Sequence, residues 1–137
     1  MYRKIVIPVD LAHLGDLTKA MQTAADLARL YSIPVVYVAV AGTTPDEVAR
    51  TPEEHAEKLR ALAREQGARH GHEASAHPLH SADPQGELNR LLRATTAELG
   101  ADLVVMASHK PAFLDWLLPS HGGSIAEHSD ASVFVVR

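Results

Sequence analysis

Three polar segments of the sequence carry side chains that could bind a charged small molecule. Asp10 supplies a carboxylate directly after an apolar run, where it could accept hydrogen bonds from hydroxyl or amino groups. The segment Ser108–Lys110 combines a hydroxyl, an imidazole and an ammonium, a set that suits an anion. In the segment Ser120–Ser124, glycines and small hydroxyls precede a predicted helix, so that free N–H groups could converge on a phosphate.

Each of these segments also has a purely structural explanation. An aspartate that follows a strand is a common N-cap or turn residue. Ser108–Lys110 could be a solvated loop that Pro111 ends, and Gly122–Gly123 could form a turn before an N-cap at Ser124. From the residues alone, both explanations stay open for every segment.

Motifs for nucleophilic or metal-assisted catalysis are missing from the sequence. It has no cysteine, no G-x-S-x-G elbow and no Walker motif. Ser108 and His109 do not form a dyad, because neighbours in an extended chain point in different directions. The nine histidines show none of the spacings of a zinc site. We therefore predict no catalytic residue and no resident metal ion.

The apolar pattern predicts strands that alternate with helices. Apolar or alternating runs predict strands over residues 3–10, 33–41, 73–79, 101–108 and 132–136. Helical spacing and capping residues predict helices over 16–31, 51–66, 83–100 and 120–129. Two capping-box patterns stand in tandem at Thr44–Glu47 and Thr51–Glu54, and we expect the second to open its helix.

This order of elements predicts where a ligand would bind. Strands that alternate with helices form a parallel sheet with right-handed crossovers. The most apolar strands, 3–10 and 101–108, belong at its centre, and the weaker strand 73–79 belongs at an edge. We therefore expect an α/β fold of Rossmann-like type: an open five-stranded parallel sheet of order 3-2-1-4-5 with helices on both faces. Asp10 and Ser108–Lys110 then meet in the crevice where the connections diverge.

Composition narrows the class of protein. The chain has 137 residues, of which 46% are hydrophobic, so we expect a single domain over residues 1–137 with a substantial core. Its formal net charge of −4 argues against nucleic acid as a partner. No apolar run reaches the roughly 18 residues of a membrane span, and the N-terminus lacks a signal-peptide pattern. We expect no membrane insertion and a cytoplasmic location.

Both ends of the sequence resemble the universal stress protein family. The opening Met1–Asp10 is similar to the start of these domains, and the stretches 101–109 and 132–137 are similar to their end. The resemblance covers essentially the whole chain. It implies a five-stranded parallel α/β fold, usually a homodimer, with ATP, AMP or another adenine nucleotide in the crevice and Mg²⁺ as its possible companion. The implied function is a nucleotide-binding regulatory module in the stress response.

The phosphate-binding motif of that family is altered here. Its pattern is G-x-x-G followed by G-[ST], but Ala107 and Lys110 stand where the first two glycines are expected. The spacing is closer to a branch with S-H-[RK]-P followed by L-L-G-S-N-A, in which Pro119 replaces the glycine. Proline has no N–H to donate. Either Ser120–Gly122 still supply enough donors, or the affinity for a triphosphate is lost.

The resemblance also implies roles for individual residues. Asp10 would meet the adenine or ribose, and Val38 would offer backbone groups and an apolar wall to the adenine. Ala107 and the residues after it would line the ribose and first phosphate, and the segment from Ser120 would hold the outer phosphates. The full implied set is Pro8, Val9, Asp10, Val38, Ala107, Ser108, His109, Lys110, Ser120, His121 and Gly122.

The last predicted strand suggests self-association. Val133–Val136 is apolar and expected at a sheet edge, where an uncovered strand would pair with a second copy. The alternative is a cover formed by the chain's own loop, for which Phe113 and Trp116 are candidates. Two further functions stay open: a dimeric scaffold with a degenerate pocket, and a slow ATPase. The sequence does not identify a regulated protein partner, such as a solute transporter.

Overall fold

The computed structural model describes residues 1–107 and 130–137. In these two ranges the strands and helices follow the predicted alternation. The elements are β1 (Ile5–Pro8), a 3-10 helix η1 (Leu11–Leu17), α1 (Thr18–Tyr31), β2 (Val35–Ala41), α2 (Pro52–His70), β3 (Ala74–His80), α3 (Pro84–Glu98), β4 (Leu103–Ala107) and β5 (Ser132–Val136). The predicted helix over 120–129 lies outside the described residues.

All five strands form one parallel sheet of order β3-β2-β1-β4-β5, which confirms the predicted topology. β1 lies between β2 and β4, with Ile5 opposite both Val35 and Leu103. Its four residues are all buried. A strand with neighbours on both sides and helices on both faces has no position for an exposed side chain, which explains its continuous apolar run.

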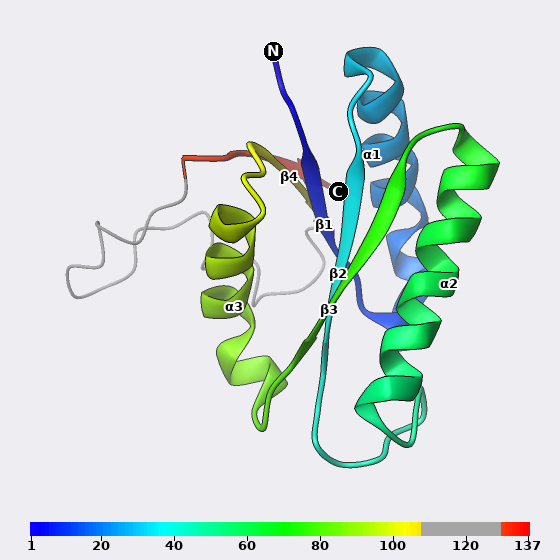
Figure 1. Cartoon of the computed structure of the whole chain (residues 1–137), viewed down its shortest axis with the longest axis vertical. Helices are drawn as coiled ribbons and strands as arrows, with labels where there is room; N and C mark the ends of the chain where they lie inside the picture. Colours follow the sequence, from blue (N-terminus) through cyan, green and yellow to red (C-terminus); the bar gives the residue numbers. More distant parts are fainter. Residues whose placement is uncertain (108–129) are drawn as a thin grey trace.

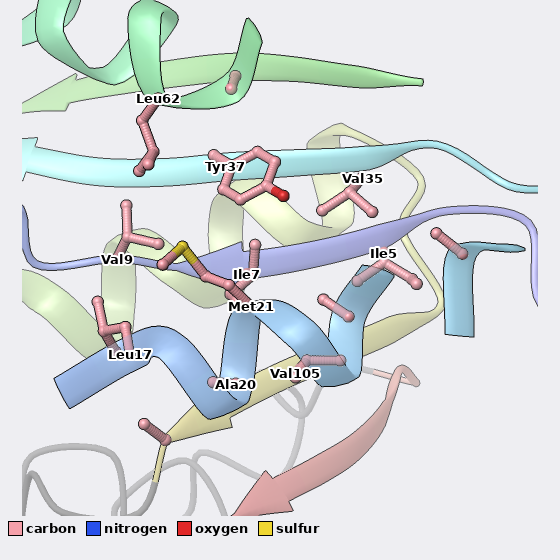
Figure 2. Close-up of a cluster of buried hydrophobic side chains, with 14 of the residues drawn as sticks. Ile5, Ile7, Val9, Leu17, Ala20, Met21, Val35, Tyr37, Leu62 and Val105 are labelled. Carbon is pink, nitrogen blue, oxygen red and sulfur yellow. The ribbon is translucent and has the colours of Figure 1, made fainter. Parts of the chain in front are cut away.

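The helices cover the two faces of the sheet unequally. α1 and α2 pack on one face and α3 on the other (Figure 1). Side chains of β1 alternate between the two layers: Ile5 and Ile7 belong to the core under α1 and α2, whereas Val6 belongs to the smaller core under α3. Figure 2 shows the larger core, where side chains of β1, β2 and β4 meet those of α1 and α2.

Helix α2 begins as predicted but ends later. The hydroxyl of Thr51 accepts a hydrogen bond from the amide of Glu54 at 3.1 Å, so this residue is the N-cap. The helix continues past residue 66 to His70, and Gly71 ends it in the left-handed conformation with φ of 71°. Gly67 lies inside the helix, where a Cβ would come within 2.9 Å of the carbonyl oxygen of His72.

The first of the tandem capping boxes forms no helix. Its third residue, Asp46, accepts hydrogen bonds from the amides of Val48 and Ala49 at 2.9 and 3.0 Å. The amide of Asp46 in turn donates to the carbonyl of Ala49 at 3.0 Å, which closes a tight turn. The Asp side chain therefore satisfies the backbone locally, and the segment 42–51 remains a loop between β2 and α2.

At the amino edge of the sheet, Asp102 connects β4 to the chain before β1. Its Oδ1 accepts from the amides of Arg3 and Lys4 at 3.0 and 3.2 Å, and the ammonium of Lys4 donates to the carbonyl of Leu99 at 2.9 Å. Burial works against ionisation of Asp102, but the hydrogen bonds from these amides outweigh it and lower its pKa. Within residues 1–107 and 130–137, no helix combines the length and the apolar character that crossing a membrane requires.

Candidate functional site

A cavity of about 900 Å³ lies at the carboxyl edge of the sheet. Its size is in the range of small-molecule sites, roughly 300–1,000 Å³. The β2–α2 loop that borders it is at the bottom of Figure 1. The described lining residues are Pro8, Val9, Asp10, Leu11, Ala12, His13, Leu17, Val38, Ala39, Val40, Gly42, Thr43, Thr44, Asp46, Glu47, Val48, His55, Ala82, Pro84, Gln85, Leu88 and Leu92.

The cavity brings together four of the residues that the sequence predicted for the site. Pro8, Val9, Asp10 and Val38 all line it. Ala107, at the end of β4, is buried in the larger core and is not among the described lining residues. The other predicted residues, Ser108, His109, Lys110, Ser120, His121 and Gly122, lie outside the described part of the chain.

Asp10 has both of the roles considered from the sequence, because it caps a helix and lines the cavity. Its Oδ1 accepts from the amide of Ala12 at 3.0 Å, as the N-cap of η1. Its Oδ2 lies 3.0 Å from Nδ1 of His13. The side chain is 31% exposed, so the carboxylate is held in place while part of it still faces solvent.

The backbone of Val38 is already used by the sheet. Its carbonyl accepts a hydrogen bond from the amide of Val9 at 2.8 Å, and the β1–β2 pairing ends at this residue. β2 continues for three residues to Ala41, and we call this stretch, Ala39–Ala41, the overhang. Alternate residues of a parallel strand direct their N–H and C=O groups to the same neighbour. Val40 therefore directs both groups to the side of β1, beyond the point where β1 has ended.

Val40 is a site residue that the sequence analysis missed. Val40 lines the cavity and is half-buried, whereas Val38 is fully buried. Because Val40 stands two positions after Val38 on the same face, the apolar wall assigned to Val38 also includes it. Finding it required the length of β1 and the register between the two strands, neither of which the apolar pattern specifies to a single residue.

His55 is the second missed residue. It lies in the first turn of α2, is 7% exposed and lines the cavity. Its Nδ1 is buried without a hydrogen-bond partner. A signal was present in the sequence, because His55 is four residues before Leu59 and therefore on the inward face of the helix. Burial lowers the pKa of His55 more than the nearby carboxylates of Asp46 and Asp10 raise it.

The charged side chains in the described lining are acidic, apart from the histidines. Asp10, Asp46 and Glu47 contribute carboxylates, and neither lysine nor arginine is among the described lining residues. Hydrogen bonds from the amides of Ala49 and Val48 lower the pKa of Asp46. This part of the cavity therefore offers acceptors to hydroxyl and amino groups and repels phosphate.

The opposite wall of the cavity is apolar. α3 contributes Leu88 and Leu92, and Pro84 at its start stands within 3.4 Å of where a Cβ on Gly42 would lie. The leucine side chains also pack in the smaller core with Val38. An apolar wall beside a strand edge whose backbone groups have no partner among the described residues suits a flat heteroaromatic ring.

The fold is that of a doubly wound α/β protein, and its cavity lies at the carboxyl edge of the parallel sheet, where such folds bind ligands. The profile of the Universal stress protein family matches residues 1–137. The chain therefore belongs to this family, as the resemblance of its two ends predicted.

Solved structures of family members share this fold. A universal stress protein family protein from Burkholderia pseudomallei is 17% identical, with 98% of this chain and 96% of that chain covered and a TM-score of 0.69. A universal stress protein from Archaeoglobus fulgidus is 19% identical, with both chains covered completely and a TM-score of 0.63. A universal stress protein in complex with cAMP is 20% identical, with 99% and 97% covered and a TM-score of 0.60.

Proposed function

We propose that this protein binds an adenine nucleotide, AMP or ATP, at the carboxyl edge of its sheet and acts as a regulatory module in the stress response. The observation that carries the proposal of ligand binding is the cavity of about 900 Å³. The role in the stress response is inferred from membership of the Universal stress protein family. Universal stress proteins of the same fold have been solved with cAMP, dAMP and AMP.

The described lining of the cavity suits the nucleoside part of such a ligand. The carboxylate of Asp10 accepts from ribose hydroxyls, and the N–H and C=O of Val40 match the acceptor and donor on the edge of an adenine ring. Leu88 and Leu92 contact the face of the ring. Because the described charges are acidic, the phosphates point away from Asp46 and Glu47.

The phosphate half of the site stays a prediction from the sequence. We propose that Ala107, Ser108, His109 and Lys110 meet the first phosphate, and that Ser120, His121 and Gly122 meet the outer ones. These residues end β4 or follow it in the sequence, which is compatible with the orientation of the nucleoside, since β4 neighbours β1 in the sheet. ATP rather than AMP, an accompanying Mg²⁺ and a cytoplasmic location are likewise predictions.

Isothermal titration calorimetry with AMP, ADP, ATP and GMP tests the proposal. We expect saturable binding of at least one adenine nucleotide and weaker binding of GMP. Leu88→Trp, which fills the cavity, should reduce the affinity, whereas Leu30→Trp at a residue 71% exposed should leave it unchanged. Absence of heat with every nucleotide at millimolar concentration, together with no nucleotide in an acid extract of the purified protein, would contradict it and favour the scaffold alternative.

We also propose that two copies pair through β5. In the described sheet β5 is hydrogen-bonded to β4 alone, and Phe134 is 45% exposed on its outer side. Val133 and Val135 pack into the smaller core, so the strand is anchored on one face and apolar on the other. An edge of this kind is stabilised by pairing.

Light scattering of the wild-type protein and of Phe134→Glu tests this pairing. We expect a dimer for the wild type at micromolar concentration and a monomer or aggregate for the variant. Arg64→Glu, which places the same charge on the exposed surface of α2 over the opposite end of the sheet, is the matched control and should remain a dimer. A wild-type monomer would contradict the proposal.

A further inference from the structure

We propose that His55 is a ligand-binding residue of this cavity, and that its Nδ1 forms a hydrogen bond with the nucleoside part of the bound adenine nucleotide. The inference rests on the proposed function, and it assigns a contact that neither the family motif nor the sequence pattern contains. Three observations carry it: the position of the side chain, the state of its Nδ1 atom and the groups around it.

The position of His55 is fixed by the helix. Thr51 caps α2, and the amide of His55 donates to the carbonyl of Thr51 at 3.1 Å, so the imidazole leaves the first turn at a defined angle. Leu59 lies one turn further on the same face and is fully buried in the larger core. The helix therefore cannot rotate to bring the imidazole into solvent.

The Nδ1 atom is unpaired in a place where a polar atom ordinarily has a partner. Buried polar atoms without a hydrogen bond are uncommon in folded proteins, because each one destabilises the fold. In the described part of the chain, a few other buried side-chain atoms also lack a partner, among them the hydroxyl of Tyr37 and Nε2 of His72. Neither residue is among the described lining of the cavity, and their rings stack on each other with centroids 6.4 Å apart. Of these three residues, His55 is the one that lines the cavity.

The groups around His55 suit a neutral imidazole that faces a neutral part of the ligand. Asp46 from the β2–α2 loop, Asp10 from the end of β1 and Lys58 on α2 act on it electrostatically, and burial lowers its pKa. Glu47 and His13 are the other titratable groups in the described lining. A neutral imidazole adds no cation for a phosphate, but it supplies hydrogen-bonding nitrogens for a base or ribose.

The test compares His55→Phe with His55→Asn by measuring the dissociation constant for AMP and the thermal midpoint of each variant. Phenylalanine keeps an aromatic ring at this position but has neither nitrogen, whereas asparagine keeps a polar atom near the position of Nδ1. We expect His55→Phe to bind AMP about tenfold more weakly, and His55→Asn to recover most of that loss. His80→Asn, at an exposed histidine at the end of β3, is the matched control and should bind as the wild type does.

The stability measurement separates binding from a structural role. Because His55→Phe removes an unpaired buried atom, we expect its melting temperature to equal or exceed that of the wild type while its affinity falls. If His55→Phe melts lower and binds AMP normally, His55 is a core residue only and the inference is wrong. Failure of His55→Asn to recover affinity would also overturn it.

Two analogues locate the contact. Purine riboside 5′-monophosphate lacks the amino group of AMP, and dAMP lacks the 2′-hydroxyl. If the penalty of His55→Phe disappears with one of them, that group is the partner of Nδ1, and an equal penalty with both leaves the 3′-hydroxyl or a ring nitrogen of the base as the partner. Absence of AMP binding by the wild type would overturn the proposed function and the inference together, whereas equal AMP binding by wild type and His55→Phe would overturn the inference alone.

Discussion

At the amino edge of the sheet, Asp102 accepts hydrogen bonds from the amides of Arg3 and Lys4. At the carboxyl edge, the overhang of β2 directs the backbone of Val40 past the end of β1, and the Nδ1 atom of His55 is buried without a partner. Asp102 at the first edge is paired within the chain, whereas Val40 and His55 at the second edge line a cavity. Substitutions at the first edge should therefore change stability, and substitutions at the second should change binding.

The largest expected effect is at the amino edge. Asp102→Ala leaves the amides of Arg3 and Lys4 without their acceptor and should lower the free energy of unfolding by about 2 kcal/mol. Urea denaturation followed by circular dichroism measures this. Because the pKa of Asp102 is lowered in the fold, its contribution is present above pH 4 and is lost as the pH falls through the folded-state pKa. If Asp102→Ala is as stable as the wild type at pH 7, the amino edge does not contribute to stability in the way proposed, and the two edges no longer differ in this respect.

The second-largest effect is expected from removing a backbone N–H in the overhang of β2. Val40→Pro removes the N–H that faces the cavity and should weaken AMP binding about tenfold, while Val40→Ala keeps the N–H and should bind within about twofold of the wild type. Calorimetric titration of both variants gives the comparison. The fold should tolerate the proline, because the N–H of Val40 points past the end of β1 and no hydrogen bond of the described sheet uses it. Equal affinity in the two variants would show that the ligand does not use this amide.

A smaller effect is expected at Asp10, which both caps η1 and lines the cavity. Asp10→Asn keeps an oxygen that can cap η1 but removes the charge, so AMP should bind about fivefold more weakly with stability nearly unchanged. Asp10→Ala also removes the cap and should lower the free energy of unfolding by about 1 kcal/mol. If Asp10→Asn binds as tightly as the wild type, the carboxylate serves η1 alone.

The smallest effect concerns pH. The folded protein resists protonation of His55, whereas the unfolded chain accepts a proton near the ordinary pKa of 6.5, so the contribution of this residue to stability is present above pH 6.5 and is lost as the pH falls. Asp46 and Asp10 oppose this loss and Lys58 adds to it. His55→Phe should therefore show a shallower decline of stability between pH 7 and pH 5 in parallel urea titrations. Identical slopes would mean that another group controls the acid response.

The topology could be predicted from the sequence because the length and continuity of each apolar run indicate how deeply its strand is buried. The continuous runs at 3–10 and 101–108 placed β1 and β4 at the centre, and Pro78 marked β3 as an edge strand. Asp10 could be found because the carboxyl end of a central strand is where such a sheet binds ligands. The position of Asp10 in the predicted sheet was therefore sufficient to identify it as a candidate site residue.

The rest of the cavity could not be predicted for two different reasons. Val40 contributes through its backbone, which has the same chemistry at every non-proline position, so no side-chain pattern marks it. His55 was visible as an inward position of α2, but a histidine on an inward face has no defined role until the elements around it are placed. The first of the tandem capping boxes could not be interpreted from the sequence for a similar reason. The Asp46 side chain accepts hydrogen bonds from the backbone of a turn, and no helix forms there.

The overhang of β2 also bears on how this protein can diverge. The main-chain groups are the same for every non-proline residue, so position 40 can vary among apolar β-forming residues without changing either the hydrogen bonds or the apolar wall that it offers to a ligand. Surveys that look for invariant side chains will pass over such a position, and related chains with little sequence in common can present the same edge to a ligand. Among apolar residues, proline is excluded there because it has no N–H to donate.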